Sequence, residues 1–317
     1  MLSEETPAIS VCIPVYNGVA YVKEAIESVL AQDYPAFEVK VCENVSTDQT
    51  REILIALEKD LADPRLEISY ESEHVPLAAN LNRAARMGTN GWLLVLSADD
   101  TLLPGALQVL GAGITAHPDA DLLIGRASYL VEGGDRTLGR SDYQHPPGPV
   151  SDLEEFVVGN SFPVNINATL LRKEWAVFRE DCGVVCDLNL LIQLGQAGKK
   201  AVLIDEKIIG YREHAGATSS NRVKMWSESL AVYLDHLGTS ARPDLYRRRL
   251  FRMLFWCSSY LKDQGESAQA RALVNKASQA LGPARRFVLL ALLKLPLSIR
   301  SLEKLRALRR RFLGVQP

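Results

Sequence analysis

Residues 9–18 read Ile-Ser-Val-Cys-Ile-Pro-Val-Tyr-Asn-Gly. The run from Ile9 to Val15 is apolar and rich in β-branched side chains, which is typical of a buried strand. It ends in a Pro-Val-Tyr-Asn-Gly turn, after which residues 21–32 place apolar side chains at helical spacing until Asp33-Tyr34-Pro35 ends the pattern. The start of the chain therefore predicts a strand, a turn and a helix.

The same alternation continues through the next 70 or so residues. Further strands are predicted over residues 38–43, 66–70 and 92–97, with helices beginning near residue 50 and spanning 77–87. Ser46, Thr47 and Asp48 supply side chains that can cap the first of these helices. Strands that alternate with helices indicate crossover connections, so the expected fold class is α/β with a mainly parallel sheet.

The composition is that of a folded globular chain. Hydrophobic residues make up 47% and charged residues 23% of the 317 residues. An odd number of cysteines without a paired Cys-x-x-Cys pattern, and an N-terminus without a basic-then-apolar leader, favour a reducing cytoplasm. Cys182 and Cys186 are four residues apart, but no second Cys/His pair nearby completes a zinc site.

Charge is distributed unevenly along the chain. The formal net charge is only -2, but residues 242–317 carry 17 Lys/Arg against 4 Asp/Glu, and residues 1–241 carry 19 against 34. Such an asymmetry predicts an anionic partner for the C-terminal part. A nucleic acid is a poor candidate, because no recognition motif or regular pattern of stacking aromatics accompanies the charge.

The C-terminal part is expected to be helical. Helical spacing covers residues 226–237, 245–264, 268–281 and 302–312. Arginine clusters at 247–249, 285–286 and 309–311 flank apolar residues that include Phe251, Leu254, Phe255, Trp256 and the run 287–293. That run is far shorter than the ~20 apolar residues that cross a bilayer. We expect these helices to attach the protein peripherally to an anionic membrane surface. The alternative is that their apolar faces pack on the catalytic domain and their arginines are simply solvated.

Two adjacent carboxylates, Asp99 and Asp100, follow the predicted strand at 92–97. Open α/β sheets bind ligands at the carboxyl ends of their strands. Adjacent carboxylates repel each other, so a cation is their natural partner. The alternative is that one of them caps a helix that begins near Pro104.

Four separated segments together resemble family 2 glycosyltransferases. They are residues 9–17, 28–35, 43–48 and 97–100, in this order. With Cys186-Asp187 and Tyr211-Arg212-Glu213-His214, the resemblance extends over roughly the first 220 residues. It implies the Rossmann-like, nucleotide-sugar-binding GT-A fold with a mixed, mainly parallel sheet. We therefore expect a catalytic domain over residues 1–222 and a basic amphipathic helical region over 223–317.

The resemblance implies a nucleoside pocket after the first two strands. Pro14 and Tyr16 would line it, with Tyr16 stacked on the base. Glu43 and Asn44 align with a carboxylate pair that reads base and ribose in the family. The family usually has Asp at the position of Asn44. Asp offers only acceptors to a base, whereas Asn offers a donor as well, so the preference for a UDP-sugar is less firm than the family suggests. The alternative is that Asn44 is an ordinary turn residue, and Asn82 is a further, weaker pocket candidate.

The resemblance also assigns roles around the carboxylate pair. Asp99 would contact the ribose, and Asp100 would coordinate a divalent metal, Mn²⁺ or Mg²⁺, that bridges the diphosphate. His214 is a candidate third ligand, and its alternative is a loop histidine held by a hydrogen bond.

Arg212 is the candidate for neutralising the diphosphate. A guanidinium matches phosphate geometry. The alternative is an ordinary surface ion pair with Glu206 or Glu213.

An inverting transfer needs a base that deprotonates the acceptor hydroxyl. The resemblance assigns this role to Asp187, which precedes an apolar helical face formed by Leu188, Leu190, Leu191 and Leu194. The alternative is that Asp187 caps this helix. Asp181 is the second candidate for the base.

The function expected is transfer of a sugar from a nucleotide-diphosphate donor to a saccharide or polyprenyl-linked saccharide acceptor. The resemblance is to enzymes of bacterial surface polysaccharide synthesis, which would place the protein in the cytoplasm or on the inner face of the cell membrane. Residues 125–161, rich in Gly and Pro, are expected to be irregular and to suit a loop near the acceptor. A nucleotidyltransferase is disfavoured because residues 14–18 lack Lys and Arg. A catalytically silent nucleotide-binding assembly protein is a further alternative.

Overall fold

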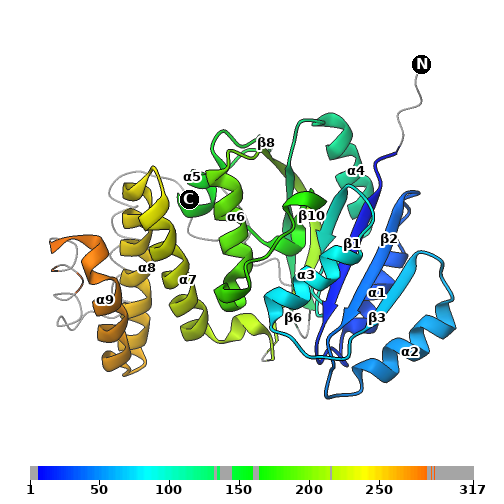
Figure 1. Ribbon diagram of the computed structural model, residues 1–317, viewed down its shortest axis with the longest axis horizontal. Helices are drawn as coiled ribbons and strands as arrows, with labels where there is room; N and C mark the ends of the chain where they lie inside the picture. The colour runs from blue at the N-terminus through cyan, green and yellow to red at the C-terminus, as the bar shows by residue number, and fades with distance from the viewer. Residues whose placement is uncertain are drawn as a thin grey trace. The chain divides into compact units, whose positions relative to one another are not determined.

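The computed structural model of the protein describes residues 6–131, 134–135, 145–159, 164–214, 216–283, 287 and 289 (Figure 1). The chain divides into two compact units, residues 1–221 and 222–317. The first unit is built on a single mixed sheet, and the second consists of helices.

The sheet has the strand order β3-β2-β1-β4-β9-β6-β10-β5. Its strands are β1 (Ile9–Val15), β2 (Phe37–Glu43), β3 (Leu66–Tyr70), β4 (Trp92–Val95), β5 (Thr101–Leu102), β6 (Leu122–Val131), β9 (Thr169–Arg172) and β10 (Ala201–Arg212). The short β7 (Gly134–Asp135) pairs with β6, and β8 (Gly148–Pro149) pairs with β10. The pairs β1–β2, β1–β4, β2–β3 and β6–β10 are parallel, and β9 runs antiparallel to both of its neighbours. The expected α/β fold with a mainly parallel sheet is confirmed.

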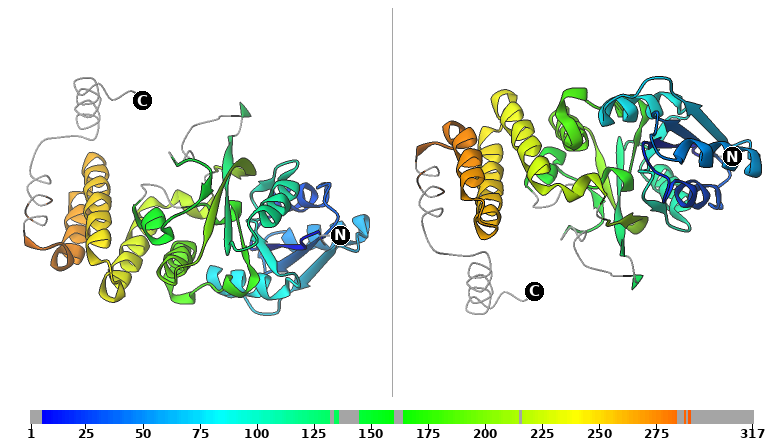
Figure 2. Two further views of the ribbon diagram at one scale, coloured as in Figure 1. Left: turned by 90° about the horizontal axis from the view of Figure 1, so that it is seen from above. Right: turned by 90° about the horizontal axis from the view of Figure 1, so that it is seen from below.

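Helices cover both faces of the sheet (Figures 1 and 2). They are α1 (Val22–Leu30), α2 (Thr50–Leu61), α3 (Leu77–Met87), α4 (Ala106–Ala116), α5 (Leu153–Gly159) and α6 (Cys186–Gln196), with 3₁₀ turns η1 (Ile166–Ala168), η2 (Lys173–Trp175), η3 (Glu180–Val185) and η4 (Thr218–Ser220). The chain steps outward from β1 to β2 to β3 and then returns past β1 to β4. Because crossovers are right-handed, this reversal moves α3 to the face opposite α1 and α2.

The reversal between β1 and β4 makes a topological switch point. Ligands of open α/β sheets bind outside the carboxyl ends of the strands at such a point. β1 is buried along its length apart from Pro14, which is half-buried. β4 is buried throughout, and β6 and β10 run in the same direction as β4. The residues that follow β1, β2, β3, β4 and β10 therefore meet at one edge of the sheet.

The structure corrects the expectation of an irregular segment over residues 125–161. Gly125 lies inside the ten-residue strand β6, and Leu153–Gly159 forms helix α5. A Cβ atom on Gly125 would lie 2.2 Å from Cγ1 of Ile208 on the neighbouring strand β10. This glycine therefore allows two strands to pack closely and does not mark a turn. Residues 132–133, 136–144 and 160–163 lie outside the described residues.

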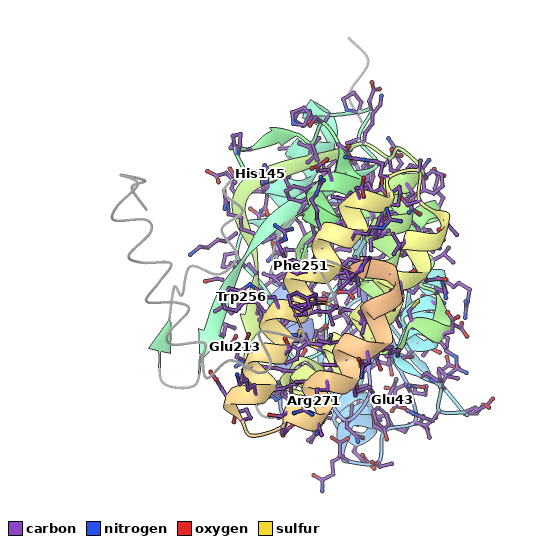
Figure 3. All side chains as sticks on the ribbon, turned by 90° about the vertical axis from the view of Figure 1, so that its left-hand side faces the viewer. Glu43, His145, Glu213, Phe251, Trp256 and Arg271 are labelled. Atoms are coloured by element: carbon purple, nitrogen blue, oxygen red, sulfur yellow. The ribbon has the colours of Figure 1, made fainter. Side chains whose placement is uncertain are left out.

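The second unit contains α7 (Arg222–Thr239), α8 (Pro243–Asp263) and α9 (Ser267–Leu281). The predicted helix over residues 302–312 lies outside the described residues. On α8, Leu250, Leu254 and Leu261 are buried, whereas Phe251 and Trp256 are half-buried (Figure 3). Leu254 is therefore part of the packed interior and not of an exposed apolar face. Among the described residues, none of the helices is both long and apolar enough to cross a bilayer.

Candidate active site

Asp100 ties the end of β4 to the end of β10. Its side chain is buried, and Oδ1 accepts the backbone N–H of Arg212 at 2.8 Å while Oδ2 accepts Nδ2 of Asn167 at 2.6 Å. Burial, followed by the neighbouring charge of Asp99, raises the pKa of Asp100 to about 8. Helix α4 begins at Ala106 with Gly105 at its N-cap, so neither Asp99 nor Asp100 caps it.

Asp99 is the more open of the two carboxylates. Its side chain is 33% exposed, and Oδ2 lies 3.1 Å from Nε2 of His214. A carboxylate accepts hydrogen bonds, so in this pair Nε2 of His214 carries the proton. The carboxylate and the imidazole come from positions 115 residues apart and lie side by side at the carboxyl edge of the sheet.

The side chain of Arg212, at the end of β10, contacts three residues. Its Nε donates to the backbone oxygen of Asp99 at 3.0 Å, and its Nη2 donates to Glu24 of α1 at 2.7 Å. The guanidinium lies 4.7 Å from the ring of Tyr21, whose centroid is also 5.0 Å from that of His214. Its observed ion pair is with Glu24, whereas the sequence suggested Glu206 or Glu213 as alternatives.

Sequence reasoning missed Tyr21, Glu24 and Asn167. Tyr21 and Glu24 lie at the start of α1, directly after the opening motif, where the sequence shows only helical periodicity. Asn167 lies in the short turn η1, and no sequence pattern relates it to Asp100. These three contacts come from the pairing of distant segments.

The residues present fit an open divalent-metal site. Asp99 offers carboxylate oxygen and His214 offers imidazole nitrogen, both of which Mn²⁺ accepts, and Nε2 of His214 would release its hydrogen to bind a cation shared with Asp99. Within the part of the chain that the structure describes, no group of three or more His, Cys, Asp or Glu residues is placed to enclose a metal ion. Two protein ligands suit a cation that keeps water and takes its remaining ligands from substrate phosphates.

Tyr16 follows β1 and is 46% exposed. Its ring centroid lies 4.4 Å from that of His74, and the two ring planes make an angle of 46°. Because Tyr16 keeps much of its apolar ring in solvent, it is a candidate surface for stacking a flat base. Pro14 lies within β1 opposite Cys42 and is half-buried.

Glu43 and Asn44, the two residues after Cys42 of β2, direct their polar atoms into the protein. Glu43 is fully buried and accepts Nε of Arg51 at 2.7 Å and the backbone N–H of Ser46 at 2.5 Å. Burial alone would raise the pKa of Glu43, but these hydrogen bonds outweigh it and lower the pKa. Asn44 accepts the backbone N–H of Val75 at 2.9 Å and donates to its oxygen at 2.8 Å.

Two residues beside this edge have left-handed backbone conformations. Asn17 has φ 53° and Val45 has φ 57°. The two loops are tied together, because Asn17 N–H donates to Ser46 at 3.0 Å and Asn17 Oδ1 accepts Thr47 N–H at 2.8 Å. A β-branched residue in this conformation is strained, and such strain is concentrated at functional sites.

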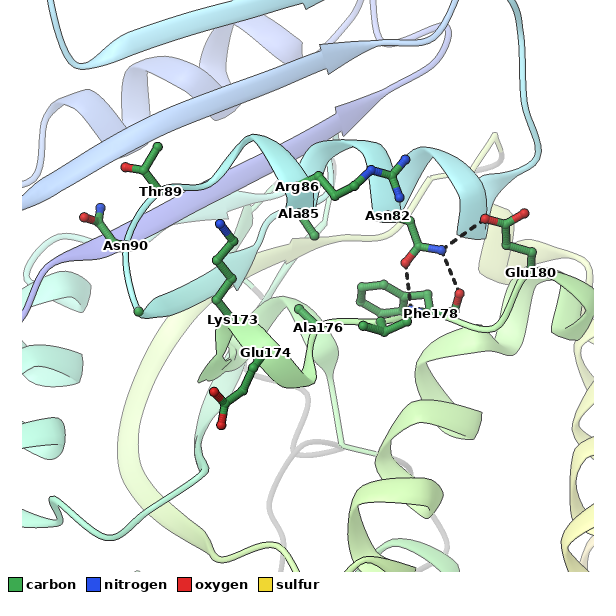
Figure 4. Close-up of a pocket in the computed structure, with 12 residues that line it drawn as sticks. Asn82, Ala85, Arg86, Thr89, Asn90, Lys173, Glu174, Ala176, Phe178 and Glu180 are labelled. Carbon is green, nitrogen blue, oxygen red and sulfur yellow. Dashed lines mark hydrogen bonds between the residues drawn. The ribbon is translucent and has the colours of Figure 1, made fainter.

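Asn82 lies in α3 and pairs with the segment before η3. Its Nδ2 donates to the oxygen of Phe178 at 2.8 Å and to Glu180 at 3.2 Å, and its Oδ1 accepts Phe178 N–H at 2.8 Å (Figure 4). It lines a pocket of about 840 Å³ whose wall also includes Thr89, Asn90 and Gly91. Those residues precede β4 and Asp99 follows it, so the pocket opens roughly 15–20 Å from Asp99 along the strand direction.

Asp187 lies in the first turn of α6 and is half-buried. Its Oδ1 accepts the backbone N–H of Leu188 at 2.8 Å, while the N-cap position belongs to Val185. Burial raises the pKa of Asp187 to about 6. Among the described residues, no hydrogen bond or ion pair joins Asp187 to Asp99, His214 or Tyr16.

Asp181, the second candidate for the base, has a different environment. It is exposed and pairs with Arg179 at 2.5 Å, and this hydrogen bond lowers its pKa. A lowered pKa makes a carboxylate a weaker base. Cys182 and Cys186 are both buried.

Comparison with known proteins extends this description. The model of glycosyl transferase family 2 matches residues 10–175. The chain is 30% identical over 226 residues to the uncharacterized protein y4gI of Sinorhizobium fredii, an alignment that covers 70% of this chain but only 24% of that protein. It is 34% identical over 94 residues to TuaG of Bacillus subtilis, covering 30% and 36% of the two chains, and the name of TuaG assigns it to teichuronic acid biosynthesis.

A solved structure has the same fold. Residues 1–349 of TarS from S. aureus, in complex with UDP-GlcNAc, superimpose with a TM-score of 0.65 at 20% sequence identity. The alignment covers 89% of this chain and 83% of that one. The expected GT-A-like architecture is thus shared with a protein that binds a nucleotide-sugar.

Proposed function

This chain belongs to glycosyl transferase family 2, and from that premise we propose that it transfers a sugar from a UDP-sugar to a saccharide or polyprenyl-linked saccharide acceptor, with inversion. The observation that carries the proposal is the arrangement along one edge of the sheet. Tyr16 and His74 lie after β1 and β3, and Asp99 and His214 lie after β4 and β10. From β3 to β4 there are three strand spacings, about 14 Å, over which a nucleoside diphosphate extends.

We assign the nucleoside to Tyr16 and the diphosphate to Asp99 and His214. Tyr16 stacks on the base, while Asp99 and His214 would hold a divalent cation, Mn²⁺ or Mg²⁺. Such a cation neutralises the charge that develops on the departing diphosphate. This arrangement moves the main metal ligand from Asp100, where the resemblance puts it, to Asp99. The reason is that both oxygens of Asp100 already accept hydrogen bonds within the fold.

Asp187 acts as the base in this proposal. It takes the proton of an acceptor hydroxyl, whose oxygen attacks the anomeric carbon from the face opposite the diphosphate. The bond between that carbon and the diphosphate oxygen breaks, and the nucleoside diphosphate leaves. The raised pKa of Asp187 supports this role, because a base works best with a pKa near the working pH.

The test is donor binding followed by product analysis. Thermal unfolding is measured with UDP-, GDP- and dTDP-sugars, with Mn²⁺ and with EDTA, because a ligand that binds only the folded state raises its stability. We expect UDP-sugars to raise the unfolding temperature only in the presence of metal. NMR of the product of an active donor then reports the anomeric configuration. The proposal fails if no nucleotide-sugar stabilises the protein.

We also propose that the C-terminal unit attaches the enzyme to an anionic membrane surface at the cytoplasmic face. The supporting observations are the excess of basic residues over 242–317 and the exposed side chain of Arg248 on α8. Flotation with anionic and with neutral liposomes tests this, using the full chain and Arg248→Glu. Recovery that is independent of lipid charge would contradict the attachment. Such attachment would bring the enzyme to a lipid-linked acceptor, as a role in surface polysaccharide synthesis requires.

A further inference from the structure

His74 lies on the loop after β3, beside the proposed stacking surface. It is exposed, and its ring centroid is 4.4 Å from that of Tyr16. Nothing in the opening motif or in the carboxylate pair involves this residue. Its place beside Tyr16 puts it within reach of the edge of a base stacked on that ring.

The hydrogen bond that His74 makes sets its tautomer. Nδ1 lies 3.1 Å from the backbone oxygen of Asn44. A carbonyl oxygen only accepts, so Nδ1 carries the hydrogen, and the neutral imidazole then presents the lone pair of Nε2. Among the described residues, Nε2 of His74 has no hydrogen-bond or ion-pair partner. The loop therefore presents an oriented acceptor.

The two neighbouring side chains that would otherwise read the base are occupied. Asn44 uses its amide oxygen and nitrogen on the backbone of Val75. Glu43 is fully buried and accepts from Arg51 and Ser46. The polar groups of Glu43 and Asn44 thus hold the loop in place. Nε2 of His74 is an acceptor beside Tyr16 that remains available to a base.

We propose that His74 determines base specificity by accepting a ring N–H of the nucleobase. Uracil and guanine carry such an N–H on the edge that pairs with other bases, whereas cytosine and adenine carry a bare nitrogen there. Two facing acceptors repel and leave both groups without a partner. The site therefore takes UDP or GDP and rejects CDP and ADP. This inference rests on the proposed nucleotide-sugar donor.

Binding of four nucleoside diphosphates tests this role. Affinities of UDP, GDP, CDP and ADP are measured by calorimetry with Mn²⁺ at pH 8. We expect the wild type to prefer UDP over CDP by about ten-fold or more. His74→Phe keeps a ring against Tyr16 but removes the acceptor. We expect it to reduce this preference to about two-fold or less, because UDP loses a hydrogen bond and CDP no longer meets a facing acceptor.

Two controls separate base reading from a structural effect. N3-methyl-UDP lacks the ring N–H, so it should bind the wild type as weakly as CDP and should not respond to His74→Phe. Tyr16→Ala should weaken UDP and CDP by the same factor and keep their ratio. Full UDP preference in a folded His74→Phe protein would overturn the inference and leave the proposed function standing. Absence of nucleotide binding by the wild type would overturn both.

Discussion

The backbone N–H of Arg212 donates to Oδ1 of Asp100 at 2.8 Å, across 112 residues of sequence. This bond joins the end of β4 to the end of β10 and is partly buried, whereas the bond from Asn167 to the same carboxylate is buried. It makes the two adjacent carboxylates different: Asp100 is buried and supports the fold, whereas Asp99 is partly exposed and is the one to which we assign the ligand.

Asp100→Ala is expected to lower the free energy of unfolding by about 2–4 kcal/mol, because it leaves the buried amide of Asn167 and the partly buried N–H of Arg212 without an acceptor. Asp99→Ala, at a partly exposed position, should change it by less than about 1 kcal/mol. Urea titrations compare the two. Asp100→Asn is the matched control and should be milder than alanine, since burial already favours a neutral group there. Equal losses for Asp99→Ala and Asp100→Ala would contradict this division.

Asp99→Asn and His214→Ala are expected to weaken metal-dependent UDP binding by about 10–100-fold, as removal of a metal ligand or its support does. Calorimetry in Mn²⁺ and in EDTA isolates the metal-dependent part. The EDTA affinities should match the wild type, because the proposed base contacts lie at Tyr16 and His74. Retention of wild-type affinity in Mn²⁺ by both variants would exclude the assignment.

Arg212→Lys is expected to lower kcat/KM more than Glu24→Gln does. The guanidinium donates to the Asp99 backbone and to Glu24 and lies over Tyr21, and an ammonium on a flexible stem cannot reproduce this set. Glu24 is 58% exposed, so its ion pair alone contributes little. Steady-state kinetics for both variants, with Lys23→Gln as a neighbouring control on α1, measure the difference. A larger loss of kcat/KM in Glu24→Gln than in Arg212→Lys would contradict this expectation.

The pH profile of kcat/KM should show an acid limb near pH 6. A base must be deprotonated, and burial raises the pKa of Asp187 to about 6, so the rate falls about ten-fold for each pH unit below that value. Asp187→Asn should lose this limb and about 10²–10⁴ in rate. Donor binding by the variant, measured in parallel, should stay near wild type. If Asp187→Asn keeps the acid limb of the pH profile, a group other than Asp187 causes that limb.

Glu38 should stabilise the fold at neutral pH and not in acid. Burial tends to raise its pKa, but hydrogen bonds from Ser10, Thr89 and Lys40 outweigh this and lower the pKa to about 2. Since the folded value lies below the unfolded one, the contribution is present above about pH 4.5 and is lost as the pH falls toward 2. Glu38→Gln should therefore cost about 3 kcal/mol at pH 7 and much less at pH 3.5. A pH-independent cost in urea titrations would argue against this ionisation.

The sequence predicts the fold well where periodicity and strand ends carry the information. β1 and the helices α2 and α3 begin close to where their patterns do, and the carboxylates follow β4. Periodicity does not show which partner a side chain meets. Arg212 pairs with Glu24, 188 residues away, and not with a neighbour in its own segment.

Local patterns also failed where a residue serves packing. Residues 125–161 were expected to be irregular, but Gly125 lies within strand β6, where the close approach of Ile208 requires a glycine. For Asn44 the sequence suggested either a base contact or a turn. In the structure its side-chain amide donates to the backbone oxygen of Val75 and accepts the backbone N–H of the same residue. Such roles depend on which loops meet, and a single sequence does not contain that information.

The sheet edge at which we propose that the donor binds draws its residues from the beginning, the middle and the end of the first unit. Tyr16 and Asp99 lie within the segment matched by the family, whereas Arg212 and His214 come after it. A chain still being synthesised would therefore present Tyr16 and Asp99 long before Arg212 and His214. Under the proposed assignment, the enzyme would gain full donor affinity in a late step, when β10 inserts beside β6.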